Sequence, residues 1–323
     1  MKKLLLALLL IPLLAFAWEP TKPITVSIGN APGAGNEIAF RKLAEIVQKT
    51  NPNINFIVEN RPGADSVINM NHLMTQPNNG YYAAIPSHMS TYVTNDIWET
   101  KIKKFNYDSF TDVISIGKSP LVLVAHTSSK INTPQEFAQL VQKTNKPINI
   151  AIGGGAHRMA FEYFMVKTKG NADQVKLIKF QGPLQAVTSV ASYDGKSGTE
   201  FGIMPITIAK PLIDGGKVKP IGFTGNRTLS SYPNVPLLAT VTPGIDVYAG
   251  WAIALPPNTP KDIVDWYVKT FSDAINTTEY RAWMYTNLVF VDESELTPRG
   301  FRRFIDRLRG NFMPLAKTLK LDE

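Results

Sequence analysis

The sequence contains no cysteine and only four histidines among its 323 residues. The absence of cysteine excludes disulfides, thiolate metal sites, a cysteine nucleophile and a lipid-modified N-terminal cysteine. The histidines stand in neither the HxH nor the HExxH spacing that is typical of metal ligands. We therefore expect no metal site and no cofactor.

Beyond its N-terminus the sequence also lacks an apolar run of the ~18–20 residues needed to cross a bilayer. At the N-terminus, Lys2 and Lys3 precede a short apolar run, residues 4–14, which leads into Ala15-Phe16-Ala17. A charged start, a short apolar stretch and a small-x-small exit are typical of a secretory signal peptide. We expect cleavage after Ala17 and a soluble periplasmic protein that begins at Trp18.

Clustered charge is scarce as well. The formal net charge is +8, and basic residues gather only in residues 299–310, RGFRRFIDRLRG. Nucleic-acid binding predicts basic clusters with interleaved aromatic residues, whereas this spacing is typical of a solvated helix face. We expect no nucleic-acid partner and a mild preference for anionic ligands.

Catalytic motifs are missing in the same way. The chain has no GxSxG elbow and no Walker loop, and it cannot form a Cys–His pair. We therefore expect no enzyme activity. A secreted hydrolase stays open as an alternative, and it would require Ser87, His88 and an acidic side chain to converge.

Short β-rich runs alternate with helical patterns along the chain, which predicts an α/β fold with largely parallel sheets. The length favours two lobes, because single cores stop growing near ~250–300 residues. Thr133, Pro134 and Glu136 predict a capped helix start, and Thr259 with Pro260 repeats the pattern. The predicted strands are Ile24–Gly29, Asn55–Glu59, Tyr81–Pro86, Leu121–His126, Ile148–Gly153, Lys176–Phe180, Phe201–Met204, Lys219–Thr224 and Ala249–Leu255.

Two segments combine a strand, a glycine turn and a helix. The first, residues 27–49, contains Pro32, Gly33, Ala34, Gly35 and Asn36. A helix N-terminus behind such a turn can hold a carboxylate or phosphate with backbone N–H groups. An ordinary tight turn between strand and helix is the alternative.

The second segment, residues 148–167, contains Gly153, Gly154, Gly155, Ala156 and His157. With one such turn in each lobe, two helix N-termini would face one cleft and clamp a small carboxylate. His157 would either donate to that ligand or merely stand at a helix start.

Two further polar stretches follow predicted strands. Ser87 and His88 form a third candidate ligand contact, while Glu59 and Arg61 favour a local ion pair over a ligand contact. Asp108 and Asp112 lie in a polar stretch and are expected to cap a turn.

An ordered set of motifs resembles the Bug-type extracytoplasmic solute receptors, the binding components of tripartite tricarboxylate transporters. Each motif is moderately specific, and the set runs in order over essentially the whole mature chain. It comprises the start WEPxKPI (residues 18–24), PGAGNEIAFRKLA (32–44), VENRPGA (58–64), PNNGYYAA (77–84), YDSFTDV (107–113), SPLVLVAHTSS (119–129), GKVKPIGFTGNRTLSSYPNVP (216–236) and GWAIALPPNTP (250–260).

The resemblance implies a type II periplasmic-binding-protein-like fold, with two α/β lobes joined by two crossing strands around a ligand cleft. Lobe 1 would comprise residues 18–121 and 246–323, and lobe 2 residues 122–245. Such proteins are monomers without catalytic activity. They carry a carboxylated solute to a membrane permease of one large and one small subunit. A ligand-dependent partner of a sensor kinase on the same scaffold stays open as an alternative.

The ligand-binding residues that the resemblance and the turns together imply are Pro32, Gly33, Ala34, Gly35, Asn36, Ser87, His88, Gly153, Gly154, Gly155, Ala156, His157, Met204 and Pro205. Several positions depart from the family pattern. Asp65, Ser66 and Asn69 replace glycines, Met204 replaces an aspartate, and Arg158 stands where a histidine is common. These changes favour an acid without an amino group and leave open whether Arg158 or His157 contacts it.

Overall fold

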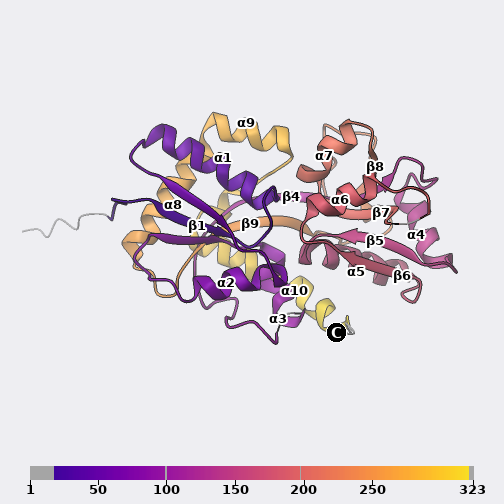
Figure 1. Cartoon of the computed structure of the whole chain (residues 1–323), viewed down its shortest axis with the longest axis horizontal. Coiled ribbons are helices and arrows are strands. Elements are labelled where there is room, and N and C mark those ends of the chain that lie inside the picture. The colour runs from indigo at the N-terminus through magenta and orange to yellow at the C-terminus, as the bar shows by residue number, and fades with distance from the viewer. Residues whose placement is uncertain (1–17, 99, 197, 320–323) are drawn as a thin grey trace, which may run out of the picture.

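The computed structural model describes residues 18–98, 100–196 and 198–319, so the predicted signal peptide lies outside the described residues. The chain forms two α/β lobes that lie side by side (Figure 1). Strand β4 (Thr111–His126) runs through both lobes, and the chain returns to the first lobe through β9 (Tyr248–Leu255). The predicted α/β class with two lobes and two crossings is confirmed.

Nine strands in the described part of the chain form one sheet, in the order β2-β1-β3-β9-β4-β7-β5-β6 with β8 paired to β4. All nine predicted strands are present, but β4 begins at Thr111 rather than at Leu121. The remaining bounds are β1 Ile24–Ile28, β2 Phe56–Asn60, β3 Tyr82–Ile85, β5 Ile148–Ile152, β6 Val175–Lys179, β7 Phe201–Pro205 and β8 Val218–Phe223.

Parallel pairing is confined to the outer strands of each lobe. In lobe 1, β1 pairs in parallel with β2 and β3, and in lobe 2, β5 pairs in parallel with β6 and β7. The crossing strands β4 and β9 are antiparallel to their neighbours. In parallel α/β sheets, ligands bind outside the carboxyl ends of the strands, where the strand-to-helix turns lie. The turns after β1 and β5 are therefore the positions to inspect.

Helices cover both lobes. Lobe 1 carries α1 Gly35–Thr50, α2 Val67–Leu73, α3 Asn95–Trp98, α8 Lys261–Asn276, α9 Thr278–Asn287 and α10 Pro298–Thr318, with a π-helical turn η2 at Ser90–Thr94. Lobe 2 carries α4 Pro134–Lys143, α5 Gly155–Thr168, α6 Pro183–Ala191 and α7 Ile206–Asp214. Short 3₁₀ turns lie at η1 Ala64–Ser66, η3 Leu238–Thr240 and η4 Glu293–Glu295.

The two predicted helix starts differ in outcome. Thr133 and Glu136 form the predicted capping box, with Pro134 as the first residue of α4. The second start lies one residue later than predicted, because α8 begins at Lys261 after Pro260. Thr259 does not cap α8, since its hydroxyl donates to the carbonyl of Pro256 at 2.7 Å.

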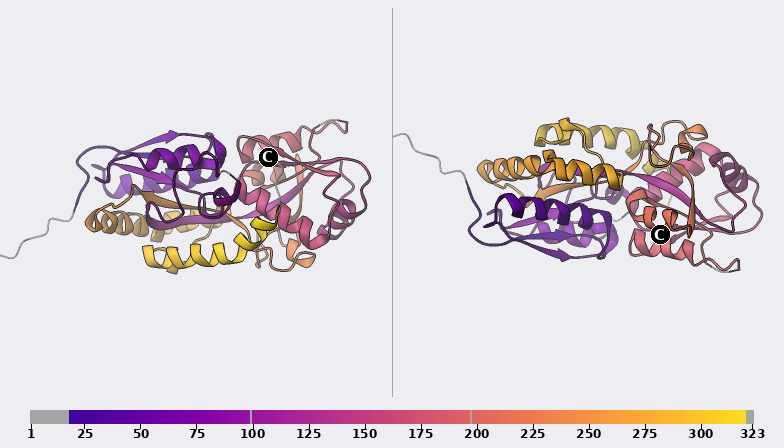
Figure 2. Two further views of the ribbon diagram at one scale, coloured as in Figure 1. Left: turned by 90° about the horizontal axis from the view of Figure 1, so that it is seen from below. Right: turned by 90° about the horizontal axis from the view of Figure 1, so that it is seen from above.

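Helix α10 connects the lobes on the side opposite α1. Figure 2 shows α10 lying along lobe 1 with its C-terminal end directed toward lobe 2. There the ring of Phe312 lies 6.3 Å from the ring of Tyr163, which belongs to α5. This helix therefore also contacts lobe 2.

Candidate ligand-binding site

The turns after β1 and β5 open into one cavity of about 40 Å³ between the lobes. Ten of the predicted residues line it: Ala34, Gly35, Asn36, Ser87, Gly153, Gly154, Gly155, Ala156, His157 and Pro205. Sequence reasoning missed the other lining residues, which are Asn30, Asp65, Ser66, Ser90, Pro183, Ala249 and Trp251. The two glycine turns therefore share one hollow, as predicted.

The structure does not bring four of the predicted residues to this cavity. Pro32 is exposed, and Gly33 is half-buried and does not line the cavity. Met204 is fully buried in the apolar core of lobe 2. His88 lines a different cavity.

The first turn presents the N-terminus of α1. The amides of Glu37 and Ile38 donate to the carbonyl of Ala34 at 3.0 and 3.1 Å and begin the helix. The amides of Gly35 and Asn36 precede these bonds, so they remain oriented toward the cavity that both residues line. Such a terminus stabilises a bound anion without a cationic side chain.

Glu37 fixes the shape of the first turn. Its Oε2 accepts from the Gly33 amide at 2.9 Å and from Asn60 Nδ2 at 3.3 Å, and Oε1 accepts from Arg41 Nε at 2.7 Å. The Gly33 amide is thus used within the turn rather than facing the cavity. Below it, Asn36 Nδ2 donates to Asn30 Oδ1 at 2.9 Å, which ties the helix start to the end of β1.

His157 has a comparable role in the second turn. Its Nδ1 accepts a hydrogen bond from the amide of Gly153 at 3.0 Å. The side chain is buried, and burial lowers the pKa of His157 to about 3, so the imidazole is neutral. A neutral ring that accepts at Nδ1 carries its proton on Nε2. The imidazole therefore holds its own turn rather than providing a positive charge.

Asp65 reaches from lobe 1 to the start of α5 in lobe 2. A Cβ atom placed on Gly155 would lie 2.3 Å from Asp65 Oδ2 and 2.9 Å from Ser90 Oγ. The carboxylate therefore rests against the backbone of the first residue of α5. No sequence pattern signalled this position, because it depends on the backbone path of the preceding loop.

That loop has an unusual conformation. Ala64, Asp65 and Ser66 all have positive φ, at 45°, 49° and 75°, and they follow Gly63, whose φ is 135°. Each non-glycine residue in the left-handed region costs on the order of 1 kcal/mol. The strained segment projects the Asp65 side chain away from its own lobe and into the cleft.

The surroundings of Asp65 influence its charge in opposite directions. Burial is the largest effect and raises the pKa of the carboxyl group. Hydrogen bonds from the Ser90 hydroxyl and the Gly155 amide, together with the charges of Lys179 and Arg158, lower the pKa. The two cationic groups lie in lobe 2, so Asp65 and its counter-charges attract each other across the cleft.

A second cavity of about 350 Å³ adjoins the first. The two share Asn30, Asp65, Gly153 and Gly154. The outer wall consists of Gly29, Pro62, Gly63, Ala64, Lys179, Phe180 and Gln181. Together the cavities provide a mixed polar and apolar space of the size that small organic ligands occupy.

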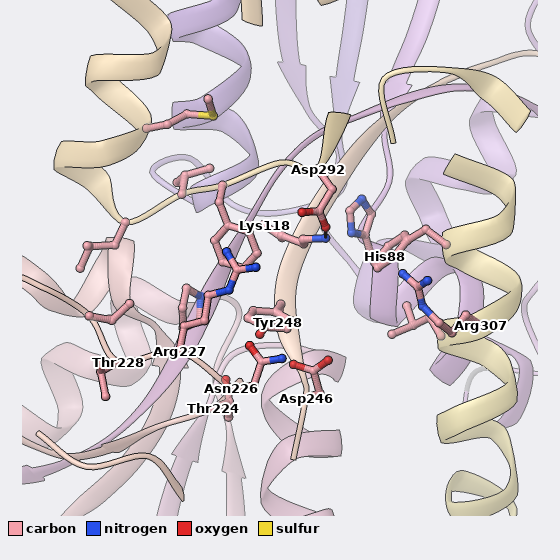
Figure 3. A pocket seen from close by; sticks show the side chains of 18 of the residues that line it. His88, Lys118, Thr224, Asn226, Arg227, Thr228, Asp246, Tyr248, Asp292 and Arg307 are labelled. Carbon is pink, nitrogen blue, oxygen red and sulfur yellow. Dashed lines mark hydrogen bonds and ion pairs between the residues drawn. The ribbon is translucent and has the colours of Figure 1, made fainter. Parts of the chain in front are cut away.

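A third cavity, also about 350 Å³, lies on the other face of the crossing strand β9 (Figure 3). Tyr248 lines it, whereas Ala249 and Trp251 line the cleft, because successive side chains of a strand point to opposite faces. His88 faces this rear cavity while Ser87 faces the cleft. This pair therefore cannot form the nucleophile–base arrangement that a hydrolase would need.

Opposite charges pair within the rear cavity. Lys118 Nζ lies 2.7 Å from Asp292 Oδ2 and also contacts Glu295. Figure 3 shows Lys118 and Asp292 directed toward one another between β4 and the segment that precedes η4. Arg227, Asp246 and Arg307 also line this cavity, so it carries further charged groups of both signs.

Within 18–98, 100–196 and 198–319, no group of three or more His, Asp or Glu side chains is arranged to hold a metal ion. Of the helices that the structure describes, none combines the length and apolar character required to span a bilayer.

Solved structures of the same fold cover almost the whole chain. The periplasmic binding protein BugD is 21% identical, covers 93% of this chain and 98% of its own, and superposes with a TM-score of 0.83. Rpa4515 of Rhodopseudomonas palustris with adipate is 18% identical, with 93% and 97% covered and a TM-score of 0.84. MatC (Rpa3494) of the same organism, with bound malate, is 19% identical, with 92% and 100% covered and a TM-score of 0.82. These likenesses establish the periplasmic-binding-protein fold.

The family assignment comes from the sequence itself. The sequence model of the family described as tripartite tricarboxylate transporter family receptor, TctC, matches residues 38–294. The match begins at Ile38, the fourth residue of α1, and includes both crossing strands and the whole of the second glycine turn. The chain therefore belongs to the TctC family of tripartite tricarboxylate transporter receptors.

Proposed function

We propose that this protein captures a carboxylated organic acid in the periplasm and delivers it to a tripartite tricarboxylate-type membrane permease. The observation that carries the proposal is the meeting of two helix N-termini, those of α1 and α5, at one cavity between two lobes. Backbone N–H groups at such termini bind carboxylates through hydrogen bonds and the helix dipole.

The same geometry provides the transport signal. The ligand contacts residues of both lobes, so it binds the closed arrangement better than an open one and shifts the equilibrium toward closure. We propose that residues 18–121 and 246–323 move as one lobe and residues 122–245 as the other. The crossings near Leu121 and Val247 would then act as the hinge, and the closed surface would be the one that the permease recognises.

The ligands of two proteins with the same fold support a carboxylate. One was solved with adipate and the other with malate, and both molecules are dicarboxylic acids. In this chain we assign ligand contact to the residues of the two turns that line the cleft, with Asn30, Asp65, Ser90 and Trp251 added to the sequence prediction. Pro32, Gly33, His88 and Met204 are withdrawn from it.

The first 17 residues would direct export and be removed after Ala17, and the mature monomer would meet a permease of one large and one small subunit. We propose a binding protein without catalytic activity, since His88 faces the rear cavity and Nδ1 of His157, which lines the cleft, already accepts from the Gly153 amide. A sensor kinase as the partner of the closed form is the second candidate.

A thermal-shift screen tests the proposal. The mature chain is heated with mono-, di- and tricarboxylates and with aromatic acids. At about 100 times its Kd, a ligand stabilises the native state by about 2.7 kcal/mol, which corresponds to a rise of about 4 °C in Tm for a chain of this size. If no acid of the four classes raises Tm, the proposal is contradicted. Pull-down of the permease subunits or of a sensor domain, with and without the stabilising acid, distinguishes transport from sensing.

A further inference from the structure

Asp65 places a carboxylate of the protein itself at one of the two anion-binding termini of the cleft. We propose that Asp65 occupies the position at the start of α5 where a second ligand carboxylate would bind, and thereby restricts this receptor to acids with a single carboxylate. The inference rests on the proposed function and specifies its substrate class.

The position that Asp65 fills is built to hold an anion. Asp65 Oδ2 would lie 2.3 Å from a Cβ on Gly155, and the Gly155 amide donates a hydrogen bond to the carboxylate. The Ser90 hydroxyl donates to it as well. These donors are the ones that an incoming carboxylate at the α5 terminus would use.

A buried hydroxyl supplies an independent indication of an anion subsite. Thr94 is fully buried, and its Oγ1 has no hydrogen-bond partner among the described residues. The same atom would lie 2.5 Å from a Cβ on Gly155, next to the Asp65 carboxylate. An unpartnered donor beside the amide of a helix start indicates a place for an oxygen acceptor.

Charge also disfavours a second ligand carboxylate at the start of α5. Burial raises the pKa of Asp65, and the charges of Lys179 and Arg158 in lobe 2 act against that rise, so part of the positive charge near this terminus already acts on a carboxylate of the protein. Two carboxylates that share one site disfavour each other's charged form. A dicarboxylate would have to displace Asp65 or bind beside it, and both options weaken its affinity.

Room remains for a monocarboxylate. The amides of Gly35 and Asn36 at the start of α1 are open to the cavity. From there a ligand chain can extend into the adjoining space of about 350 Å³, whose wall includes Pro62, Phe180 and Gln181. This wall offers apolar contact, one amide side chain and the ammonium group of Lys179.

Calorimetric titration of acids matched in chain length tests the inference. The probes are butanoate against succinate and hexanoate against adipate, measured on the mature protein, on Asp65→Gly and on Asp65→Asn. Both replacements suit the left-handed backbone at position 65, where φ is 49°. Asp173→Asn is the control, because it removes the same charge from an exposed residue that does not line the cleft.

We expect the unaltered protein and Asp173→Asn to bind the monocarboxylate of each pair more tightly. In Asp65→Gly the ratio of the dicarboxylate Kd to the monocarboxylate Kd falls at least tenfold, and in Asp65→Asn it falls by a smaller factor. The inference is overturned if the Kd ratio in Asp65→Gly stays within twofold of the ratio in the unaltered protein. It is also overturned if the unaltered protein prefers the dicarboxylate. Either result leaves the proposed function standing. Failure of every acid to bind any of the proteins overturns both.

Discussion

The indole of Trp251 packs directly against the backbone of Gly35: a Cβ at position 35 would lie 2.6 Å from Trp251 Cζ2. Gly35 is the first residue of α1, and Trp251 lies in the crossing strand β9. Both residues line the cavity between the lobes. The strand that connects the lobes therefore contacts the helix start that presents its amides to the ligand.

Gly35→Ala is expected to impair both stability and ligand binding. Overpacking a tight contact costs about 1–3 kcal/mol, and here the displaced group is the rigid indole that forms the cavity wall. We expect a loss of that size in the free energy of urea unfolding and at least tenfold weaker binding of the acid found in the screen. Gly310→Ala in α10 is the control, because its added methyl group meets nothing within 4 Å. Equal behaviour of the two variants would show that the contact with Trp251 is not restrictive.

Substitution of Gly33 by alanine should have a different effect, although Gly33 lies in the same turn as Gly35. Its φ is 82°, and an added Cβ would meet only Leu184 Cδ2, at 3.6 Å. Gly33→Ala therefore introduces backbone strain, on the order of 1 kcal/mol, without blocking the cavity. We expect a lower Tm with an affinity within about threefold of the original protein. A large loss of affinity at unchanged Tm would place the Gly33 amide at the ligand.

The Glu37 carboxylate accepts the hydrogen bonds that hold the first turn in shape, so its removal should destabilise the protein. Glu37→Ala leaves the half-buried Gly33 amide without its acceptor, while Asn60 Nδ2 keeps its bond to the carbonyl of Asn30, so we expect a loss of about 1–3 kcal/mol in total. Urea unfolding should show the loss, and ligand affinity should fall because the amides of α1 are held less firmly. Glu45→Ala on the exposed part of the same helix loses only ion pairs with Lys42 and Lys49 and should cost less than ~1 kcal/mol.

Because His157 is buried, we expect the free energy of unfolding to depend on pH. Burial lowers its pKa to about 3 in the folded chain, against about 6.5 in the unfolded chain. Below pH 6.5 the unfolded state takes up a proton that folded His157 does not, so stability falls as the pH decreases, by up to ~1.4 kcal/mol per unit. The slope of unfolding free energy between pH 6.5 and 5 should be shallower in His157→Gln by that amount. Identical slopes would mean that folded His157 titrates normally.

Local signals were enough to predict much of the fold. The nine strands followed from apolar runs, the α4 start from Thr133 and Glu136, and the Glu59–Arg61 ion pair, at 2.7 Å, from adjacency after a strand. Each of these features depends on residues within a few positions of one another. The same holds for the two glycine turns, whose meeting across the cleft then follows from the parallel α/β topology.

The errors arise where a residue's environment comes from distant parts of the chain. Asp112 was expected to cap a turn, but it is buried in β4, where Tyr92 donates to it at 2.6 Å and Arg302 pairs with it at 2.6 Å. The first half of β4 was missed for the same reason, since its partner strand β9 is more than a hundred residues away in sequence. Asp65 could not be placed, because three consecutive positive φ values direct it into the cleft.

Lys118 provides a final prediction, which concerns the region where the lobes join. Its ammonium group is buried and pairs with Asp292 and Glu295, and burial raises the pKa of Glu295 while Lys118 lowers it. Lys118→Met removes the cation and leaves Glu295 buried without it, a loss of about 3–5 kcal/mol for a broken buried pair. Because the folded pKa of Glu295 then rises further above its unfolded value, the destabilisation should increase with pH. Urea unfolding at pH 5 and pH 8 measures both effects.

In Lys118→Met/Glu295→Gln, which has no buried carboxylate at position 295, the loss should be smaller and nearly independent of pH. If the double variant is as unstable at pH 8 as the single one, the cost comes from packing rather than from the unpaired charge.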